Sequence, residues 1–409
     1  MVLVISSCTT RTSTDPLDYP IFAPEPGPTI TASPTIASEA ASQAPQPPYS
    51  IWIDPLLISL QTDLLTELEL FEPARSISDA VISISITGSE QAGTWTYLVV
   101  APFYALQDDL ELTDLITFWL TGEPVLPDIT HIYLTDNTVE HLSGYWGSPK
   151  ASIFTLTSSD KLMDLLWYNP GSIAIIPFEA ASPGYKILSI DGIFPLDPDF
   201  QPNIYGLSFP IYYSSPNVLL QDSGLGYQLS NYDQSKLTSV ALTGVTALVR
   251  ATAAIMEEKG ILYPAGDIQD ILVSADITHI SNEVPFAENC PPPNPAQESL
   301  YFCSDDRYIQ LLEAVGTDIV ELSGDHFGDW GPEAMLHSLD LYHDRDWIIY
   351  GGGETLQAGL DPVYLEHNGN KIAFIGCNGK AHDVYATASE TNPGASRCDF
   401  EWMIPQITR

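Results

Sequence analysis

The chain has 409 residues, and 44% of them are hydrophobic, which is enough for two or three domains with cores of their own. Its 53 acidic and 14 basic residues give a formal net charge of -39. A surface this acidic repels phosphate backbones and anionic membranes, so the composition argues against nucleic-acid binding. An anionic polymer or a small anionic ligand would need a local cation, such as a metal ion, in order to bind.

The start of the chain predicts a lipid anchor. The segment MVLVISSC, residues 1–8, resembles the end of a bacterial lipoprotein signal with Cys8 as the lipidated residue. The positive region of such a signal is missing and the apolar run is short, so we expect a truncated remnant; a cysteine without this role is the alternative. A lipid on Cys8 would be the only attachment to a membrane, because no later stretch is long and apolar enough to span one.

The other four cysteines fall into two sequence-local pairs, Cys290 with Cys303 and Cys377 with Cys398. In an exported protein both pairs are disulfide candidates, and free thiols are the alternative. The spacing disfavours a zinc site, because no pair shows the C-x2-C pattern.

Residues 9–48 are rich in Thr, Ser, Pro and Ala, and they predict a disordered tether. Residues 49–231 then predict an α/β domain, because strand-like and helix-like periods alternate. The expected strands are 80–87, 94–103, 172–178 and 185–192, and the expected helices are 63–71, 112–122 and 161–168. The segments FWLTG, NPGSIAIIPFE and KILSIDGIFPL, with the later YGLSFPIYY, resemble the lobes of type 2 periplasmic binding proteins, such as the phosphate-binding kind. The resemblance implies that this domain could capture a ligand between lobes.

Residues 232–409 predict a second layered α/β domain. The expected strands are 237–244, 275–281, 317–324 and 346–353, and the expected helices are 245–260, 332–343 and 400–409. A hairpin over 363–379 is predicted with Asn368-Gly369 as its two-residue turn. The last helix should lead into a further strand, so we expect this domain to be incomplete at its carboxyl end.

Polar residues follow two predicted strands of the second domain. Asn282 and Glu283 close one strand, and Asp325 and His326 close the next. In open α/β sheets, sites form at the carboxyl ends of strands, so these four side chains converge if the strands are neighbours. We expect Glu283, Asp325 and Asn282 to hold a divalent metal of unknown identity, with His326 as a catalytic acid. The alternatives are an ordinary ion pair at Glu283, turn formation at Asn282, and a solvated loop at Asp325 and His326.

Two further features give weaker signals. Thr246 and Arg250 lie at the start of a predicted helix that follows a strand, where an anion can bind, although a packing role is favoured. Asp329 precedes a helix that has Pro332 at its first position, so we expect Asp329 to cap that helix.

Residues from about 236 to 409 resemble the CapA-type capsule-synthesis proteins, which are linked to poly-γ-glutamate and have a fold like that of calcineurin-type metallophosphatases. The segments that carry the resemblance are ADITHISNEVPF, YIQLLEAVGTDIVELSGDHFGDWGPEAMLHSLDLY and IIYGGGETLQAGLDPVYLEHNGNKIAFIGCN. It implies that Asn282 and Glu283 stand at the family's Asn-Glu element. Asp325 and His326 would then stand at the second Asn and the His of its Asn-Asn-His loop.

The same resemblance places Asp329 and Gly331 at the family's Asp-x-Gly. The sequence also departs from the pattern. Residues 243–246 read Thr-Gly-Val-Thr where the family has a Gly-Asp pair with a metal-binding Asp, and Asp325 replaces an Asn. The later histidine motifs would lie beyond Arg409. These residues support one metal or none.

Together the patterns predict an extracytoplasmic, cell-surface lipoprotein of the bacterial envelope that acts in capsule or poly-γ-glutamate biosynthesis or anchoring. Its active form would be a metallophosphatase-like, metal-dependent hydrolase or transferase. The alternative is a non-catalytic ligand-binding or scaffold lipoprotein with a degenerate metal site. The sequence leaves open whether the chain is an enzyme, what its substrate is, and its oligomeric state.

Overall fold

The computed structural model describes residues 49–57, 71–126, 128–214, 229–380 and 386–407. The predicted lipidation site Cys8, the predicted tether 9–48 and nearly all of the predicted helix 63–71 lie outside these residues. The chain divides into two compact units. The larger unit includes Gly93–Pro210 and Leu229–Arg409, and the smaller one includes the described residues of Ser6–Ala92 and Ile211–Gln228. The domain boundaries expected from the sequence stay predictions.

The smaller unit is built on a short sheet in the order β2-β1-β3-β10. Its strands are β1 (Tyr49–Ile53), β2 (Phe71–Pro73), β3 (Ile82–Ser85) and β10 (Ser208–Ser214). β1 runs parallel to β2 and β3, and β10 runs antiparallel to β3. Alternating isoleucines of β1 and β3 are buried, which explains why these segments form strands.

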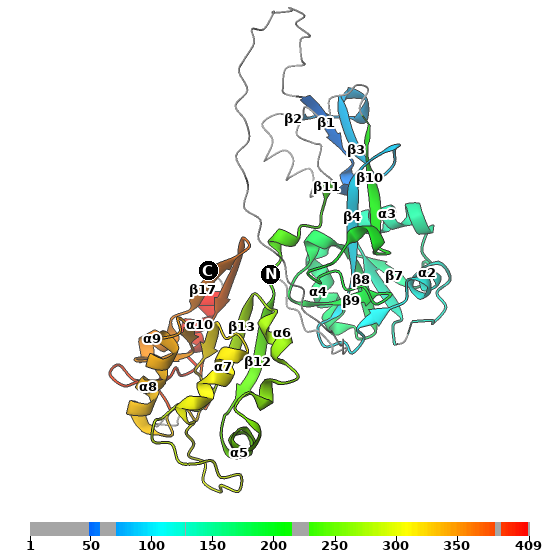
Figure 1. The fold of residues 1–409 in the computed structure, drawn as a ribbon. Coiled ribbons are helices and arrows are strands. Elements are labelled where there is room, and N and C mark those ends of the chain that lie inside the picture. Colours follow the sequence, from blue (N-terminus) through cyan, green and yellow to red (C-terminus); the bar gives the residue numbers. More distant parts are fainter. Residues whose placement is uncertain (1–48, 58–70, 127, 215–228, 381–385, 408–409) are drawn as a thin grey trace, which may run out of the picture. The chain divides into compact units, whose positions relative to one another are not determined.

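The first part of the larger unit has a mixed sheet in the order β4-β8-β6-β7. Figure 1 labels β4, β7 and β8 of this sheet. Its strands are β4 (Glu90–Pro102), β5 (Asp109–Leu110), β6 (His131–Leu134), β7 (Phe154–Leu156), β8 (Ser172–Pro177), β9 (Tyr185–Ile190) and β11 (Leu229–Ser230). Its helices are α2 (Leu112–Thr121), α3 (Asp136–Trp146) and α4 (Ser159–Tyr168). The predicted strands and helices of this region are present. The sequence patterns missed β6 and α3.

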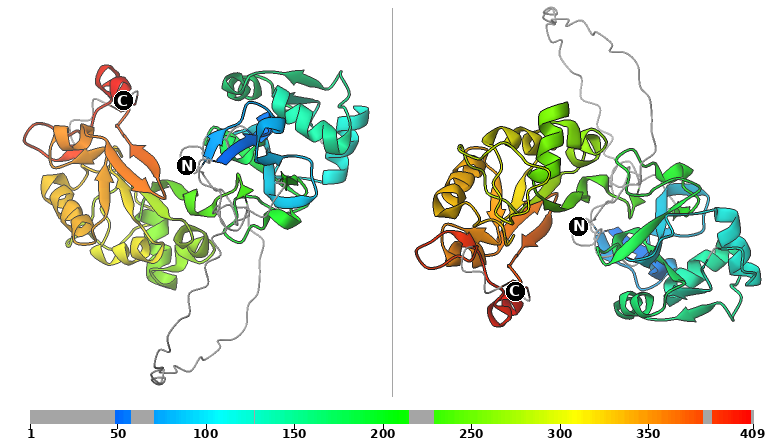
Figure 2. Two further views of the ribbon diagram at one scale, coloured as in Figure 1. Left: turned by 90° about the horizontal axis from the view of Figure 1, so that it is seen from above. Right: turned by 90° about the horizontal axis from the view of Figure 1, so that it is seen from below.

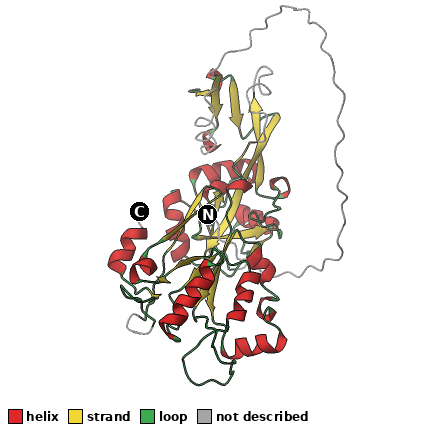
Figure 3. Cartoon of the chain, turned by 60° about the vertical axis from the view of Figure 1, so that its left-hand side comes forward, coloured by secondary structure: helices red, strands yellow, loops and turns green. Residues whose placement is uncertain are grey.

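The second part of the larger unit has a parallel sheet in the order β12-β13-β14-β15. Figure 3 distinguishes the strands of the chain, in yellow, from its helices, in red. Its strands are β12 (Val240–Thr246), β13 (Ile277–Asn282), β14 (Ile319–Glu321) and β15 (Ile348–Tyr350). The helices between and after them are α5 (Arg250–Lys259), α6 (Gln269–Val273), α7 (Ile309–Ala314) and α8 (Gly331–His343). Since all four strands run the same way, their carboxyl ends share one edge, where polar side chains can meet. The α/β class expected from the sequence is confirmed.

Each face of the parallel sheet packs against a different partner (Figure 2). Ile280 and Val320 pack with helical residues, whereas Ile277 and Ile319 pack with the hairpin residue Phe374. The hairpin consists of β17 (Val363–His367) and β18 (Asn370–Phe374). The other strands and α-helices of this part are β16 (Gly352–Gly353), α9 (Leu356–Leu360), β19 (Gly394–Ala395) and α10 (Phe400–Ile407). Among the described residues, no helix combines the length and the apolar character that a membrane crossing requires.

The helix predicted over 245–260 begins later than expected. Val245 and Thr246 belong to β12 and pair with Ser281 and Asn282 of β13 after a register shift. The helix α5 starts only at Arg250. Val245 and Thr246 are β-branched, and their partners in β13 lie far along the chain. This non-local strand pairing outweighs the local sequence pattern that predicted a helix.

Candidate metal centre

Two strand ends bring three ionisable side chains together. Glu283 follows the last residue of β13, and Asp325 and His326 lie in the loop between β14 and α8. One possible ligand atom from each of these residues lies within 4.8 Å of the other two. All three residues are half-buried. The residues that the sequence placed at neighbouring strand ends therefore lie within reach of a single ion.

The loop that carries Asp325 and His326 is fixed by its own residues. Phe327 is fully buried in the core beneath it. The backbone N–H of Asp329 donates to the carbonyl of His326 at 3.1 Å, which closes a turn. A Cβ on Gly324 would lie 2.8 Å from the Cα of Glu283. Only a glycine at this position lets the loop approach the end of β13 so closely.

Asp329 orients the imidazole. Its Oδ2 atom lies 2.7 Å from Nδ1 of His326, and it also accepts a hydrogen bond from the backbone N–H of Phe302 at 2.8 Å. The ring of Phe302 packs edge-on against His326, with the centroids 4.9 Å apart. Nε2 is therefore the nitrogen that His326 can offer to a metal or use to carry a proton.

The prediction that Asp329 caps the following helix is wrong. The N-cap residue of α8 is Trp330 and not Asp329, and the side chain of Trp330 makes no capping hydrogen bond. The carboxylate of Asp329 instead makes hydrogen bonds with the ring of His326 and the backbone N–H of Phe302. The local pattern of an acid before Pro332 gave no indication of these two partners.

Asp325 faces a lysine. Nζ of Lys380 lies 2.5 Å from Oδ2 of Asp325. Burial works to raise the pKa of Asp325, but the hydrogen bond from Lys380 and the charges of His326 and Lys380 outweigh it, so the pKa lies below its ordinary value. Asp325 is therefore held in the ionised form that a metal requires.

Glu283 has the opposite shift. Burial is the largest cause that raises its pKa, and the charge of Asp325 and a hydrogen bond with it add to the effect. The charges of His326 and Lys380 oppose it. Without a further cation, Glu283 is thus the carboxyl group of the pair that retains a proton more readily, and a bound metal ion would favour its ionised form.

Asn282 lies at the end of β13 and is fully buried. Its Nδ2 donates to the hydroxyl of Tyr342 at 2.6 Å and to the carbonyl of Val284 at 2.9 Å. Within the described part of the chain, its Oδ1 atom has no hydrogen-bond partner. A buried acceptor of this kind requires a donor or a cation.

The donor set fits a divalent cation. Two carboxylates and an imidazole nitrogen lie together, and Asn282, whose amide oxygen has no hydrogen-bond partner among the described residues, directly precedes Glu283 at the end of β13. Hard or borderline divalent ions take such ligands. The third predicted strand end contributes no acid: Thr246 pairs with Asn282, and its carbonyl accepts a hydrogen bond from the N–H of Glu283 at 3.2 Å.

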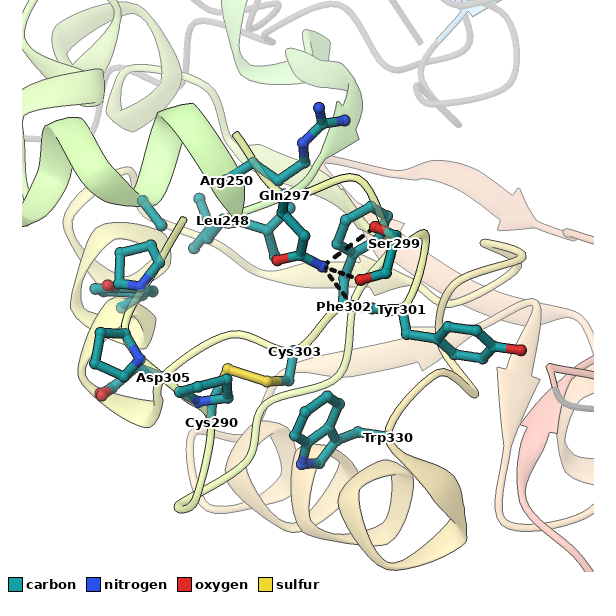
Figure 4. A pocket seen from close by; sticks show the side chains of 16 residues that line it. Leu248, Arg250, Cys290, Gln297, Ser299, Tyr301, Phe302, Cys303, Asp305 and Trp330 are labelled. Carbon is teal, nitrogen blue, oxygen red and sulfur yellow. Dashed lines mark hydrogen bonds between the residues drawn. A yellow bond between two sulfur atoms is a disulfide. The ribbon is translucent and has the colours of Figure 1, made fainter. Parts of the chain in front are cut away.

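Thr246 and Arg250, the weak anion-site candidates, are not brought together in one pocket. Arg250 begins α5 with a positive φ of 49° and lines a cavity of about 240 Å³. The same cavity is also lined by Trp330 and the Cys290–Cys303 disulfide, on the side opposite Arg250 (Figure 4). Among the described residues that line this cavity, Thr246 does not occur.

Both disulfides lie next to segments of the site. Cys290 and Cys303 are joined with an S–S distance of 2.03 Å, and Cys377 and Cys398 with one of 2.01 Å. Cys303 directly follows Phe302, the residue that touches His326 and Asp329. Cys377 lies three residues before Lys380, which contacts Asp325.

The sequence patterns missed two features of the centre. One is the contact of Lys380 with Asp325, and the other is the contact of Asp329 with His326. Lys380 is separated from Asp325 by 55 residues, so no local spacing could have joined them. The scarcity of basic residues was the one available signal, because a lysine in so acidic a chain is seldom without a nearby carboxylate.

Comparisons with known proteins match the second part of the chain to one family. Residues 239–405 match the family model of the bacterial capsule synthesis protein PGA_cap. Capsule biosynthesis protein CapA of Bacillus anthracis is 20% identical over 178 residues, which are 43% of this chain and 43% of that protein. PGA biosynthesis protein CapA of Bacillus subtilis (strain 168) is 21% identical over 173 residues, which are 42% of this chain and 44% of that protein. The match thus spans less than half the length of these relatives.

Solved structures similar to this chain include phosphate-binding receptors. An ABC-type phosphate transport receptor from Vibrio cholerae covers 44% of this chain and 92% of its own, with a TM-score of 0.32 and 11% identity. A phosphate ABC transporter substrate-binding protein from Clostridium perfringens covers 44% and 90%, with a TM-score of 0.30 and 12% identity. Similarity at this level gives no information about a ligand of this chain.

Proposed function

We propose that residues 239–405, which match the family model of the bacterial capsule synthesis protein PGA_cap, form a CapA-type domain. We further propose that the chain acts outside the cytoplasm in the biosynthesis or anchoring of a capsule polymer. The proposed active form holds a divalent ion at Glu283, Asp325 and His326. It would catalyse metal-assisted hydrolysis or transfer, either at a phosphate centre, as in a metallophosphatase-like site, or at an amide centre. The proposed ligand is an anionic polymer or a small anionic molecule.

The observation that carries this proposal is the meeting of Glu283, Asp325 and His326 within 4.8 Å. A divalent ion held there would supply Lewis-acid polarisation of a substrate oxygen and would acidify a bound water molecule. Asp329 keeps the His326 ring in a single orientation, so that Nε2 is presented each time in the same way. We favour His326 as a third ligand over a role as a free acid, because it clusters with the two carboxylates.

An extracytoplasmic location is supported by the two disulfides, since such bonds persist mainly in oxidising compartments. Anchoring through a lipid on Cys8 is proposed with it. The names of the two Bacillus relatives refer to capsule biosynthesis and PGA biosynthesis, and they motivate the proposed polymer. Their full activity is a proposal for this chain, because the match spans less than half of each relative.

A second candidate function is that of a non-catalytic ligand-binding or scaffold protein with a degenerate metal site. One observation favours it: the end of β12 reads Thr243-Gly244-Val245-Thr246 and offers no carboxylate. A centre with so few acidic ligands could keep its fold and lose its chemistry. The first predicted domain would then be the part that binds a ligand.

Metal analysis of the purified chain tests the proposal. The parent is compared with Glu283→Gln and Asp325→Asn, which keep the shape of the side chains and remove the charge. Glu366→Gln, at an exposed position of β17, is the matched control. We expect about one equivalent of metal in the parent and in the control, and a loss of at least tenfold in affinity in the two site variants.

Two results would separate the candidates. A parent that takes up no metal under metal-replete conditions contradicts the metal-dependent function and leaves the scaffold function. A His326→Ala variant that keeps its metal but loses turnover of phosphoesters or γ-glutamyl amides would make His326 the acid rather than a ligand.

A further inference from the structure

We propose that Lys380 is a built-in counter-cation of the metal centre: its ammonium group holds the cation position at Asp325 in the metal-free protein, and a divalent ion must displace it. The inference rests on the proposed metal centre and adds a determinant of how tightly that centre binds metal. It assigns Lys380 the role of a competitor for the metal, not that of a ligand.

The contact itself carries the first step. Nζ of Lys380 lies 2.5 Å from Oδ2 of Asp325, which is one of the atoms that a metal would use. The Asp325 side chain is only 17% exposed, whereas the Lys380 side chain is 71% exposed. The carboxylate is therefore fixed in the protein, while the ammonium can leave by a change of rotamer into solvent.

The backbone beneath Lys380 is held in place, so the lysine remains next to the site after its ammonium group has been displaced. Its N–H donates to Oδ1 of Asn378 at 2.8 Å, and the N–H of Asn378 donates to the carbonyl of Ser396 at 2.7 Å. The Cys377–Cys398 disulfide joins the same two segments. A tethered competitor acts at a high effective concentration, so its effect does not depend on dilution.

Charge explains why the position requires a cation. Glu283 and Asp325 place two carboxyl groups at a half-buried site, where like charges disfavour each other. The ammonium of Lys380 relieves that repulsion in the metal-free state. Once a divalent ion is bound, the same ammonium is a like charge next to it. Removal of the Lys380 charge should thus strengthen metal binding for two reasons: the competing cation is lost, and so is its repulsion of the bound ion.

Calorimetric titration of the full chain with Mn²⁺ alone tests the inference. The variants are Lys380→Met, which keeps the length of the side chain and removes the charge, and the control Lys371→Met at an exposed position of β18. We expect Lys380→Met to bind Mn²⁺ about fivefold more tightly than the parent, a size typical of a largely exposed ion pair. Lys371→Met should bind like the parent, and Lys380→Arg should stay close to it.

A second readout does not depend on affinity. In the metal-free state, Lys380→Met should unfold at a lower temperature than Lys371→Met, and Mn²⁺ should raise its unfolding temperature by more than it does in the parent. Equal or weaker Mn²⁺ binding by Lys380→Met overturns this inference alone. No Mn²⁺ binding by the parent or by Lys380→Met overturns the proposed metal centre and this inference with it.

Discussion

His326 has two ring nitrogens, and Asp329 decides which of them is available. The carboxylate takes Nδ1 at 2.7 Å and is itself held by the backbone N–H of Phe302. The imidazole is thus positioned by two groups that are not among the three proposed metal ligands. At the scale of single residues, the centre depends on this second layer as much as on its three ionisable groups.

Asp329→Asn should weaken metal binding about 10- to 100-fold, because the neutral amide no longer fixes the ring and its proton as the carboxylate does. The unfolding temperature should change little, since Asn keeps the shape of the side chain. Asp340→Asn, at an exposed position of the helix α8 that follows Asp329, is the control. Metal affinity of Asp329→Asn equal to that of the parent would assign Asp329 a purely structural role.

Local sequence patterns predicted the site residues at the strand ends. The other residues of the site are brought in by contacts between distant positions, which local patterns do not reveal. Glu283, Asp325 and His326 could be predicted because the carboxyl ends of parallel strands share an edge. The ion pair between Asp325 and Lys380 joins positions 55 residues apart, which no spacing rule covers. Asp329 was assigned to the wrong partner because an acid before a helix has a common local role that competes with the real one.

At the scale of elements, the hairpin and the helix α5 show the same contrast. Asn368 and Gly369 adopt positive φ angles of 51° and 76°, as the two-residue turn requires, and the sequence alone predicted the turn. The start of α5 depends on the pairing of β12 with β13 and could not be predicted in the same way. The strand β6 was missed because it has only four residues, and the helix α3 because Leu142 is the one aliphatic residue among its three buried positions.

The strand β13 also carries a buried histidine. His279 is 5% exposed, its Nε2 lies 2.9 Å from the hydroxyl of Tyr350, and its ring stacks on Phe374. Burial lowers the pKa of His279, against an opposing effect of a backbone hydrogen bond. The folded state therefore takes up a proton less readily than the unfolded state.

The free energy of unfolding should fall as pH falls below about 6.5, the ordinary value for histidine, because the unfolded chain then binds a proton that folded His279 does not. The stability from this group is complete above that pH. His279→Gln should flatten the dependence, whereas His343→Gln, exposed at the end of α8, should not. Urea unfolding at several pH values between neutral and acid measures this. Identical slopes for parent and His279→Gln would contradict the assignment.

At the scale of the whole molecule, the formal charge of -39 sets the behaviour in salt. Most of the acidic groups have no basic partner available, because only 14 basic residues occur in the chain. Repulsion between exposed carboxylates disfavours the compact state, and it reaches over about 30 Å at low ionic strength but only about 8 Å at physiological ionic strength.

Added salt should therefore raise the unfolding temperature, by about 2–4 °C for each 1 kcal/mol of repulsion that is screened. Scanning calorimetry in NaCl and in choline chloride measures the effect. Equal shifts in the two salts would indicate screening, and a larger shift in NaCl would indicate specific sodium binding. An unfolding temperature that falls with salt would mean that ion pairs, not repulsion, dominate the surface.

The lysine at Asp325 has a consequence for how such a protein can evolve. Loss of a metal ordinarily exposes a set of carboxylates to each other, and the fold suffers at once. Here an ammonium already neutralises Asp325. Proteins of such a lineage could therefore lose the metal ion and its chemistry without an intermediate whose fold is unstable. Enzymes and scaffolds could then descend from one another by small steps in metal affinity.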